Sequence, residues 1–110
     1  TGFGVARSDS DAARWFRAAA DQNHEAAAYN LSLMYLGGVG VDRNDAAALV
    51  WYRRASDLDE PAATYEIGRF LQSGKVVPQD LVAAALWFER ASELGHEAAV
   101  QALEEVERVD

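Results

Sequence analysis

Apolar residues recur along this chain in two alternating patterns, and each pattern returns after 36 positions. The more regular pattern has the spacing i, i+3, i+4, i+7, which puts its four members on one face of an α-helix. It occurs three times, as Ala12, Trp15, Phe16 and Ala19, as Ala48, Trp51, Tyr52 and Ala55, and as Ala84, Trp87, Phe88 and Ala91. Large aromatic and small alanine side chains on one face favour close helix packing, and we expect Trp51 and Trp87 to hold the core.

A second apolar stripe lies between these copies and predicts another helix before each one. Its members are Ala27, Leu31, Met34 and Tyr35 in one copy and Ala63, Ile67, Phe70 and Leu71 in the next. We call the helix with this stripe the first helix of a pair, and the helix with the aromatic pattern the second helix. Residues 96–110 keep the stripe but place Glu107 where Tyr35 and Leu71 stand, which is typical of a terminal capping helix.

Residues at fixed positions of the repeat predict where the helices begin and end. The position before each second helix holds types whose side-chain oxygens cap helix N-termini, namely Ser8, Asn44 and Asp80. The position after it holds types that tolerate the left-handed backbone of a helix end, namely Asn23, Asp59 and Gly95. We therefore expect a loop over residues 1–7, a helix over about 8–20, and six helices in all.

A single period that runs through the whole sequence predicts a repeat array, in which each unit buries its apolar face against a neighbour. The fold class is all-α: a solenoid of antiparallel helix pairs with a 36-residue repeat. We expect one domain over residues 1–110, divided into a partial repeat (1–23), two full repeats (24–59 and 60–95) and a C-terminal capping helix (96–110).

The central unit resembles the Sel1-like repeat, a relative of the tetratricopeptide repeat. The resemblance lies in the segments 29–35 (YNLSLMY), 38–41 (GVGV), 46–48 (AAA) and 51–55 (WYRRA), and it extends over the whole chain. Ser32 stands where the family has glycine, which Gly68 retains in the next repeat, and this implies slightly looser helix packing. The resemblance implies a right-handed superhelix and a non-enzymatic adaptor or scaffold that recognises proteins.

Similarity to tetratricopeptide repeats further implies that the first helices line a concave face that binds a peptide or protein. Carried onto this sequence, the partner-binding residues would be Tyr29, Asn30, Leu33, Leu36, Tyr65, Glu66, Arg69, Gln72, Gln101 and Glu105. Helical spacing supports the choice, because these positions lie off the apolar stripe and still include tyrosine and leucine. Leu33 and Leu36 could instead complete the packing between repeats.

Composition narrows the kinds of partner. The formal net charge of −8 argues against nucleic acid, which needs a basic surface. No apolar run approaches 18 residues, so we expect no membrane insertion by this segment. Cysteine is absent, and the compartment, cytoplasmic or periplasmic, is left open. Because the chain begins with Thr1, we expect it to be a fragment of a longer protein.

The sequence gives little support for a catalytic site or a metal site. His24 and His96 each begin His-Glu-Ala-Ala, but the second histidine of a zinc motif is replaced by Ala28 or Val100. The two histidines are therefore expected to be linker residues, with no metal or other cofactor. Cysteine-rich relatives of the family have been linked to β-lactam hydrolysis, but no Ser-x-x-Lys element is present. We do not expect an enzyme.

The sequence is also compatible with two functions other than that of an adaptor. The chain could be a structural or dimerisation segment of a larger receptor or polarity protein. It could also be a periplasmic module for cell-wall glycans, with Tyr29 and Tyr65 stacking on sugars. The helix that carries Trp15 and Phe16 lacks a first helix of its own, so its apolar face should be open to a preceding repeat or to self-association.

Overall fold

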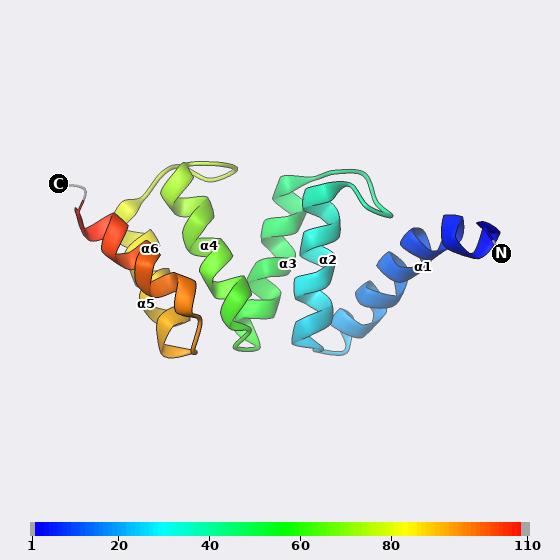
Figure 1. Ribbon diagram of the computed structural model, residues 1–110, viewed down its shortest axis with the longest axis horizontal. Helices are drawn as coiled ribbons and strands as arrows, with labels where there is room; N and C mark the ends of the chain where they lie inside the picture. Colours follow the sequence, from blue (N-terminus) through cyan, green and yellow to red (C-terminus); the bar gives the residue numbers. More distant parts are fainter. Residues whose placement is uncertain (1, 109–110) are drawn as a thin grey trace.

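The computed structural model describes residues 2–108, with side chains from Asp9 onward, and it contains six α-helices and no strand over that range. The helices are α1 (Gly2–Asp21), α2 (Glu25–Gly37), α3 (Asp45–Asp57), α4 (Pro61–Ser73), α5 (Leu81–Glu93) and α6 (Glu97–Arg108). They follow one another along an elongated molecule of 54 × 23 × 22 Å, and the two chain ends lie at opposite ends of it (Figure 1). The all-α repeat fold predicted from the sequence is confirmed.

The predicted helix boundaries are correct for the two complete pairs. Asn44 and Asp80 cap α3 and α5, each accepting a hydrogen bond of 3.0 Å from the backbone N–H three residues on. Asn23 and Asp59 each have a φ of 65° and Gly95 has a φ of 98°, so all three adopt the predicted left-handed backbone. The sequence signals therefore act locally, through the backbone groups that every helix leaves unpaired at its ends.

The loop predicted over residues 1–7 is wrong, because α1 runs from Gly2 and contains Ser8 in its interior. In the loops before α3 and α5, the chain is held by N–H groups of Asn44 and Asp80. These groups donate to the carbonyls of Tyr35 and Leu71 on the preceding first helix, both at 2.9 Å. The described residues hold no first helix before α1. Because α1 extends back to Gly2, the backbone groups of this segment pair with one another within the helix.

The core contains a close contact between an aromatic ring of a second helix and a small residue of the first helix of the same pair. Tyr52 and Phe88 are the two largest fully buried side chains. A Cβ added to Gly68 would lie only 2.6 Å from the Phe88 ring, so the glycine is required for that approach. Ser32 takes the repeat position of Gly68 in the preceding pair, and its buried hydroxyl donates to the Ala28 carbonyl at 3.0 Å.

The three tryptophans differ in burial according to how many helices surround them. Trp51 is 8% exposed and lies beneath the guanidinium groups of Arg17 and Arg54, whose carbons are 5.8 and 5.7 Å from the ring centroid. Trp87 is only half-buried, so it contributes less to the core than expected. Trp15 is 74% exposed, as predicted for the helix that lacks its first-helix neighbour.

The loop before α5 contains a strained residue. Val76 has a φ of 71°, close to the 74° of Gly40 at the same repeat position, although a β-branched side chain disfavours this region. The N–H of Val77 donates to the Lys75 carbonyl at 2.7 Å, which closes a γ-turn of the strained, positive-φ form around Val76. The repeat therefore imposes the glycine conformation on a valine.

Replacing Val76 by asparagine should raise the free energy of unfolding by about 1 kcal/mol, because asparagine tolerates positive φ and valine does not. Val76 is 48% exposed, so little packing is lost. Urea denaturation would measure the change, with Val39→Asn in the preceding loop as the control, since Val39 is similarly exposed at 43% but has no positive φ. A Val76→Asn protein less stable than wild type, by more than the control, would show that the valine is not strained.

Candidate functional site

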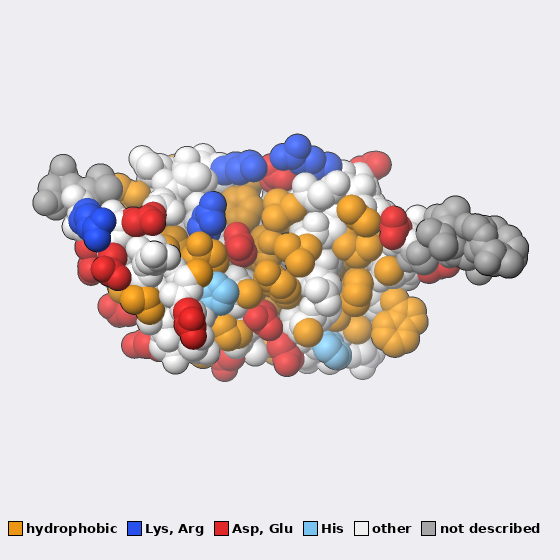
Figure 2. All heavy atoms as spheres, in the orientation of Figure 1, with side chains coloured by type: hydrophobic (Ala, Val, Ile, Leu, Met, Phe, Trp, Pro, Cys, Tyr) orange, Lys and Arg blue, Asp and Glu red, His pale blue; other side chains and the backbone are white. Residues whose placement is uncertain are grey.

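The ten residues predicted to bind a partner all lie on α2, α4 and α6, and we call the surface that they form the first-helix face. In Figure 2, hydrophobic side chains gather across the middle of the view, over α2 and α4, and basic side chains lie along its upper edge. None of the ten side chains is fully buried. The exposed members are Leu33, Arg69, Gln101 and Glu105, and the half-buried ones are Tyr29, Asn30, Leu36, Tyr65, Glu66 and Gln72.

Two adjoining hollows indent the first-helix face. The first, of about 260 Å³, lies between α4 and α6, and we call it the Tyr65 hollow. Its lining consists of Tyr65, Arg69, Gln72, Ala98, Gln101, Ala102 and Glu105. The second, of about 450 Å³, lies between α4 and the end of α2, and we call it the Glu66 hollow. Its lining consists of Leu36, Glu66, Arg69, Phe70, Gln72, Ser73 and Lys75. Arg69 and Gln72 belong to both, so the two hollows adjoin along α4, and we call the pair of hollows the groove.

Seven of the ten predicted residues line these hollows, and Tyr29, Asn30 and Leu33 do not. Tyr29 packs against the buried ring of Tyr52, with 5.8 Å between ring centroids, so part of it belongs to the core. Leu33 is 43% exposed on α2, which answers the question of whether it completes the repeat packing: much of its surface stays open. Leu36 is half-buried and lines the Glu66 hollow.

Tyr65 connects the core to the groove. Its ring lies 5.6 Å from that of Phe88 and 4.7 Å from that of His96, measured between centroids. The guanidinium of Arg69, one turn further along α4, donates to the Tyr65 hydroxyl at 3.3 Å and lies 5.8 Å from the ring centroid. These contacts fix the orientation of Arg69 at the border between the two hollows.

The two histidines have different roles. His24 caps α2, since its Nδ1 accepts a hydrogen bond of 3.2 Å from the Ala27 N–H, which agrees with its expected place in a linker. His96 stands just before α6, but its ring packs on Tyr65 beside the Tyr65 hollow. Sequence analysis missed His96 as a site residue, because its partner lies 31 positions away and no local pattern joins the two.

Glu66 is half-buried, and it lines the Glu66 hollow. Burial raises the pKa of Glu66 above its ordinary value of 4.5, against a weaker lowering by the positive charges of Arg69 and His96. Burial and the Glu66 charge also raise the pKa of Tyr29 and of Tyr52. The Tyr52 hydroxyl is buried and has no hydrogen-bond partner among the described residues.

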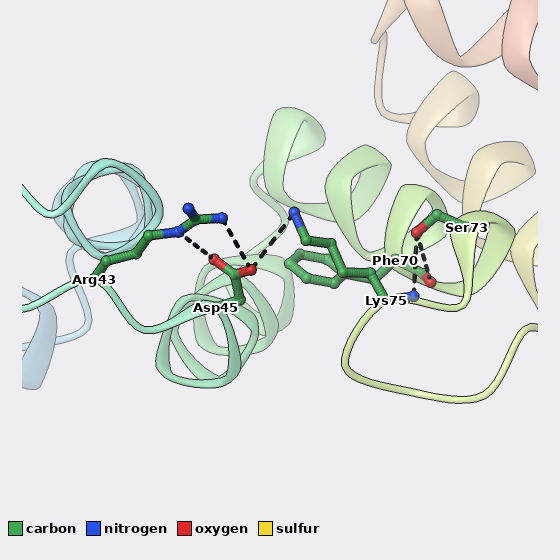
Figure 3. Close-up of polar contacts among 5 residues, drawn as sticks. All are labelled: Arg43, Asp45, Phe70, Ser73 and Lys75. Carbon is green, nitrogen blue, oxygen red and sulfur yellow. Dashed lines mark hydrogen bonds and ion pairs between the residues drawn. The ribbon is translucent and has the colours of Figure 1, made fainter.

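The upper edge of the groove carries a cation that sequence analysis did not select. Lys75 Nζ lies 3.5 Å from a carboxylate oxygen of Asp45, which also pairs with Arg43 at 3.4 Å (Figure 3). The Ser73 hydroxyl donates to the Phe70 carbonyl and accepts from the Lys75 N–H, both at 3.3 Å, so the loop is held against the end of α4. Lys75 lies two residues after the end of α4, and the fold pairs it with Asp45, which stands 30 positions earlier in the sequence.

The described residues contain no cluster of three or more histidine and carboxylate side chains that could hold a metal ion. None of the helices over residues 2–108 is both long enough and apolar enough to cross a membrane. What the arrangement offers is a groove of aromatic, aliphatic and charged side chains, suited to non-covalent recognition.

Antiparallel helix pairs that repeat their caps, loops and buried rings define an α-solenoid, the class of proteins in which each repeat packs mainly on its neighbours. The family model for the Sel1 repeat matches residues 1–24, 25–60 and 61–96. The chain therefore belongs to the Sel1 repeat family. Proteins of this family are generally protein-interaction modules and typically non-catalytic helical scaffolds.

Solved structures of bacterial proteins resemble the chain closely. A Sel1 repeat protein from Oxalobacter formigenes is 30% identical, with a TM-score of 0.81 over 86% of this chain and 39% of its own. A protective antigen of uropathogenic Escherichia coli strains, described as having an SLR fold, is 35% identical, with a TM-score of 0.76 over 81% and 19%. Cysteine rich protein B of Helicobacter pylori is 25% identical, with a TM-score of 0.78 over 83% and 68%.

The chain thus spans 39% and 19% of the length of the first two of these proteins. No curated protein sequence matches it at a significant level.

Replacing Glu66 by glutamine should stabilise the fold near neutral pH, because it removes a partly buried charge and keeps the shape of the side chain. The folded-state pKa of Glu66 is raised, so the folded protein holds that proton more tightly than the unfolded chain does. Wild-type stability therefore falls relative to the variant as the pH rises through the raised pKa, and the difference vanishes well below 4.5.

Urea denaturation of both proteins across this pH range would measure the difference between their free energies of unfolding. The contributions of the other carboxyl groups cancel in that difference, because both proteins contain them. A Glu66→Gln variant that is less stable than wild type at neutral pH would mean that the folded state stabilises the ionised carboxylate.

Proposed function

We propose that this chain is a non-enzymatic recognition module that binds a peptide or an extended segment of a partner protein along the first-helix face. The observation that carries the proposal is the groove, the pair of adjoining hollows that share Arg69 and Gln72. This face corresponds to the concave face implied by the tetratricopeptide resemblance, and the general role of the Sel1 repeat family agrees with it.

The composition of the groove supports a peptide as the ligand. Leu36 and Phe70 provide an aliphatic and aromatic floor, while Arg69 and Gln72 offer side-chain donors along the same line. A mixture of apolar surface and oriented polar groups is typical of protein interfaces. The glycan alternative is weaker, because the rings of Tyr29 and Tyr65 already pack against Tyr52, Phe88 and His96 and present less free face to a sugar.

We also propose that residues 1–110 act as one array, with repeats at 24–59 and 60–95, and that α6 caps it. Glu104 takes the repeat position of Gly68, where a Cβ would already lie 2.6 Å from an aromatic ring. Glu107 takes the position of Leu71, which packs against the core. Both glutamates on α6 are exposed, and they disfavour the packing of another second helix there.

Replacing Leu33 by aspartate together with Arg69 by glutamate should abolish binding of peptides selected on the wild-type protein from a random library displayed on phage. Both side chains are exposed, so the double variant should keep its stability, while the first-helix face loses an apolar anchor at Leu33 and the groove reverses a charge at Arg69. Fluorescence anisotropy of the selected peptides would measure the dissociation constants, and we expect them to rise at least about 100-fold.

The matched control is Leu86→Asp with Arg90→Glu, which makes the same two changes on the exposed surface of α5, away from the groove. The control should bind the peptides as the wild type does. Equal loss of binding in the two double variants, or none in the first, would rule out the first-helix face as the binding surface.

A second interaction is supported by α1. Trp15 is 74% exposed and, with Ala18, Ala19 and Gln22, lines a hollow of about 270 Å³ on the surface of α1. A large exposed apolar surface of this kind is typical of an interface. We propose that it packs against a first helix of a preceding repeat in a longer chain or, in the isolated chain, against another copy.

The isolated chain should therefore associate as its concentration rises, and Trp15→Glu should keep it monomeric because a charge cannot be buried in the apolar contact. Sedimentation equilibrium would measure the average mass of both proteins, with Val82→Glu on α5 as a control, since Val82 is 76% exposed but lies on another helix. A wild type that stays monomeric at high concentration would exclude docking between copies through α1.

A further inference from the structure

Glu66 differs from the other charged residues of the Glu66 hollow, Arg69 and Lys75, in having no hydrogen-bond or ion-pair partner among the described residues. Among the described residues, no hydrogen bond or ion pair reaches its carboxylate, although the side chain is half-buried. Arg69 is the cation one turn away on α4, but its guanidinium is directed to the Tyr65 hydroxyl. A carboxylate that has lost part of its water shell without gaining a partner is costly for the free protein.

The neighbours of Glu66 leave its carboxylate without a hydrogen bond or ion pair. The positive charges of Arg69 and His96 act on Glu66, but neither group pairs with it, and the buried Tyr52 hydroxyl has no hydrogen-bond partner either. The hollow also contains the apolar side chains of Leu36 and Phe70, beside Gln72 and Ser73. The positive charge at the upper edge, Lys75, is paired with Asp45 at 3.5 Å.

We propose, on the basis of the function proposed above, that the bound segment places a lysine or arginine side chain in the Glu66 hollow, with its cation against Glu66. The hollow has a volume of about 450 Å³, its aliphatic and aromatic walls suit the methylene stem of such a side chain, and its one carboxylate suits the cationic head. The complex would then supply the counter-charge that the free protein lacks.

The charges of the groove also argue for a basic partner and against an acidic one. Arg69 and Lys75 line the same hollow, but Arg69 donates to the Tyr65 hydroxyl and Lys75 pairs with the Asp45 carboxylate. An acidic ligand could use only the donors that these contacts leave free, and it would approach the unpaired Glu66. The net charge of −8 adds a long-range attraction for basic segments and a repulsion for acidic ones.

The experiment uses a random peptide library displayed on phage and selected on three immobilised proteins: wild type, Glu66→Gln and Glu93→Gln. Glu66→Gln removes the charge at constant shape, and Glu93→Gln makes the same change at an exposed position of α5 that lines neither hollow. We expect wild type and Glu93→Gln to enrich peptides with lysine or arginine at one fixed position, and Glu66→Gln to lose that preference.

A selected peptide and its variant with norleucine in place of the basic residue would then be titrated against each protein. The wild-type affinity should fall about tenfold on that replacement, while the affinity of Glu66→Gln should be the same for both peptides. The thermal stability of Glu66→Gln would be measured beside the titration, to show that the variant is folded.

The outcomes separate this inference from the function on which it rests. Peptides that bind the groove without a basic preference, or with one that persists in Glu66→Gln, would overturn the inference and leave the proposed function intact. Peptides that bind wild type but are insensitive to the Leu33 and Arg69 double change would overturn the proposed function. A wild-type protein that selects no peptide would overturn both.

Discussion

The close approach of a second-helix ring to a small first-helix residue is the constraint on which the rest of this structure depends. Because Gly68 has no side chain, the Phe88 ring can pack where a Cβ would lie 2.6 Å away, and both are fully buried. At the same repeat position of the preceding pair, the small Ser32 is buried and directs its hydroxyl to its own helix. The contact fixes how the two helices of a pair lie, and thereby which surfaces of α2, α4 and α6 are left open to form a groove.

That dependence explains why the sequence predicted the fold so well and the binding surface less well. Period, caps and stripes are local signals, and Asn44, Asp80 and the buried Tyr52 behave as their positions predict. Residues 1–7 were misjudged because the loop form of this segment needs backbone bonds to a first helix that the described chain lacks. The repeat pattern predicts the conformation of a segment only when the neighbouring helix of the repeat is present to pack against it. It does not predict the conformation that the segment adopts without that helix.

The binding surface is harder to predict because its character is set between repeats. Tyr65 and Glu66 could be chosen from helical spacing, but the packing of His96 on Tyr65 and the pairing of Lys75 with Asp45 each join residues far apart in sequence. Spacing also cannot tell which groove residues have partners. Arg69 and Lys75 have them and Glu66 does not, and this difference follows from side-chain geometry alone.

The features that weaken this fold are informative because they are unevenly distributed. Val76 adopts a strained backbone in a loop beside the groove, Glu66 carries a partly buried charge within it, and the Tyr52 hydroxyl lies unpaired beneath it. The outer residues of α5, such as Leu86, expose apolar surface but carry no comparable cost in backbone strain or buried charge. Marginally stable proteins retain such costs where another requirement opposes their loss, and binding sites are the usual place. Their concentration at one face of the array is a physical reason, independent of family resemblance, to seek the ligand there.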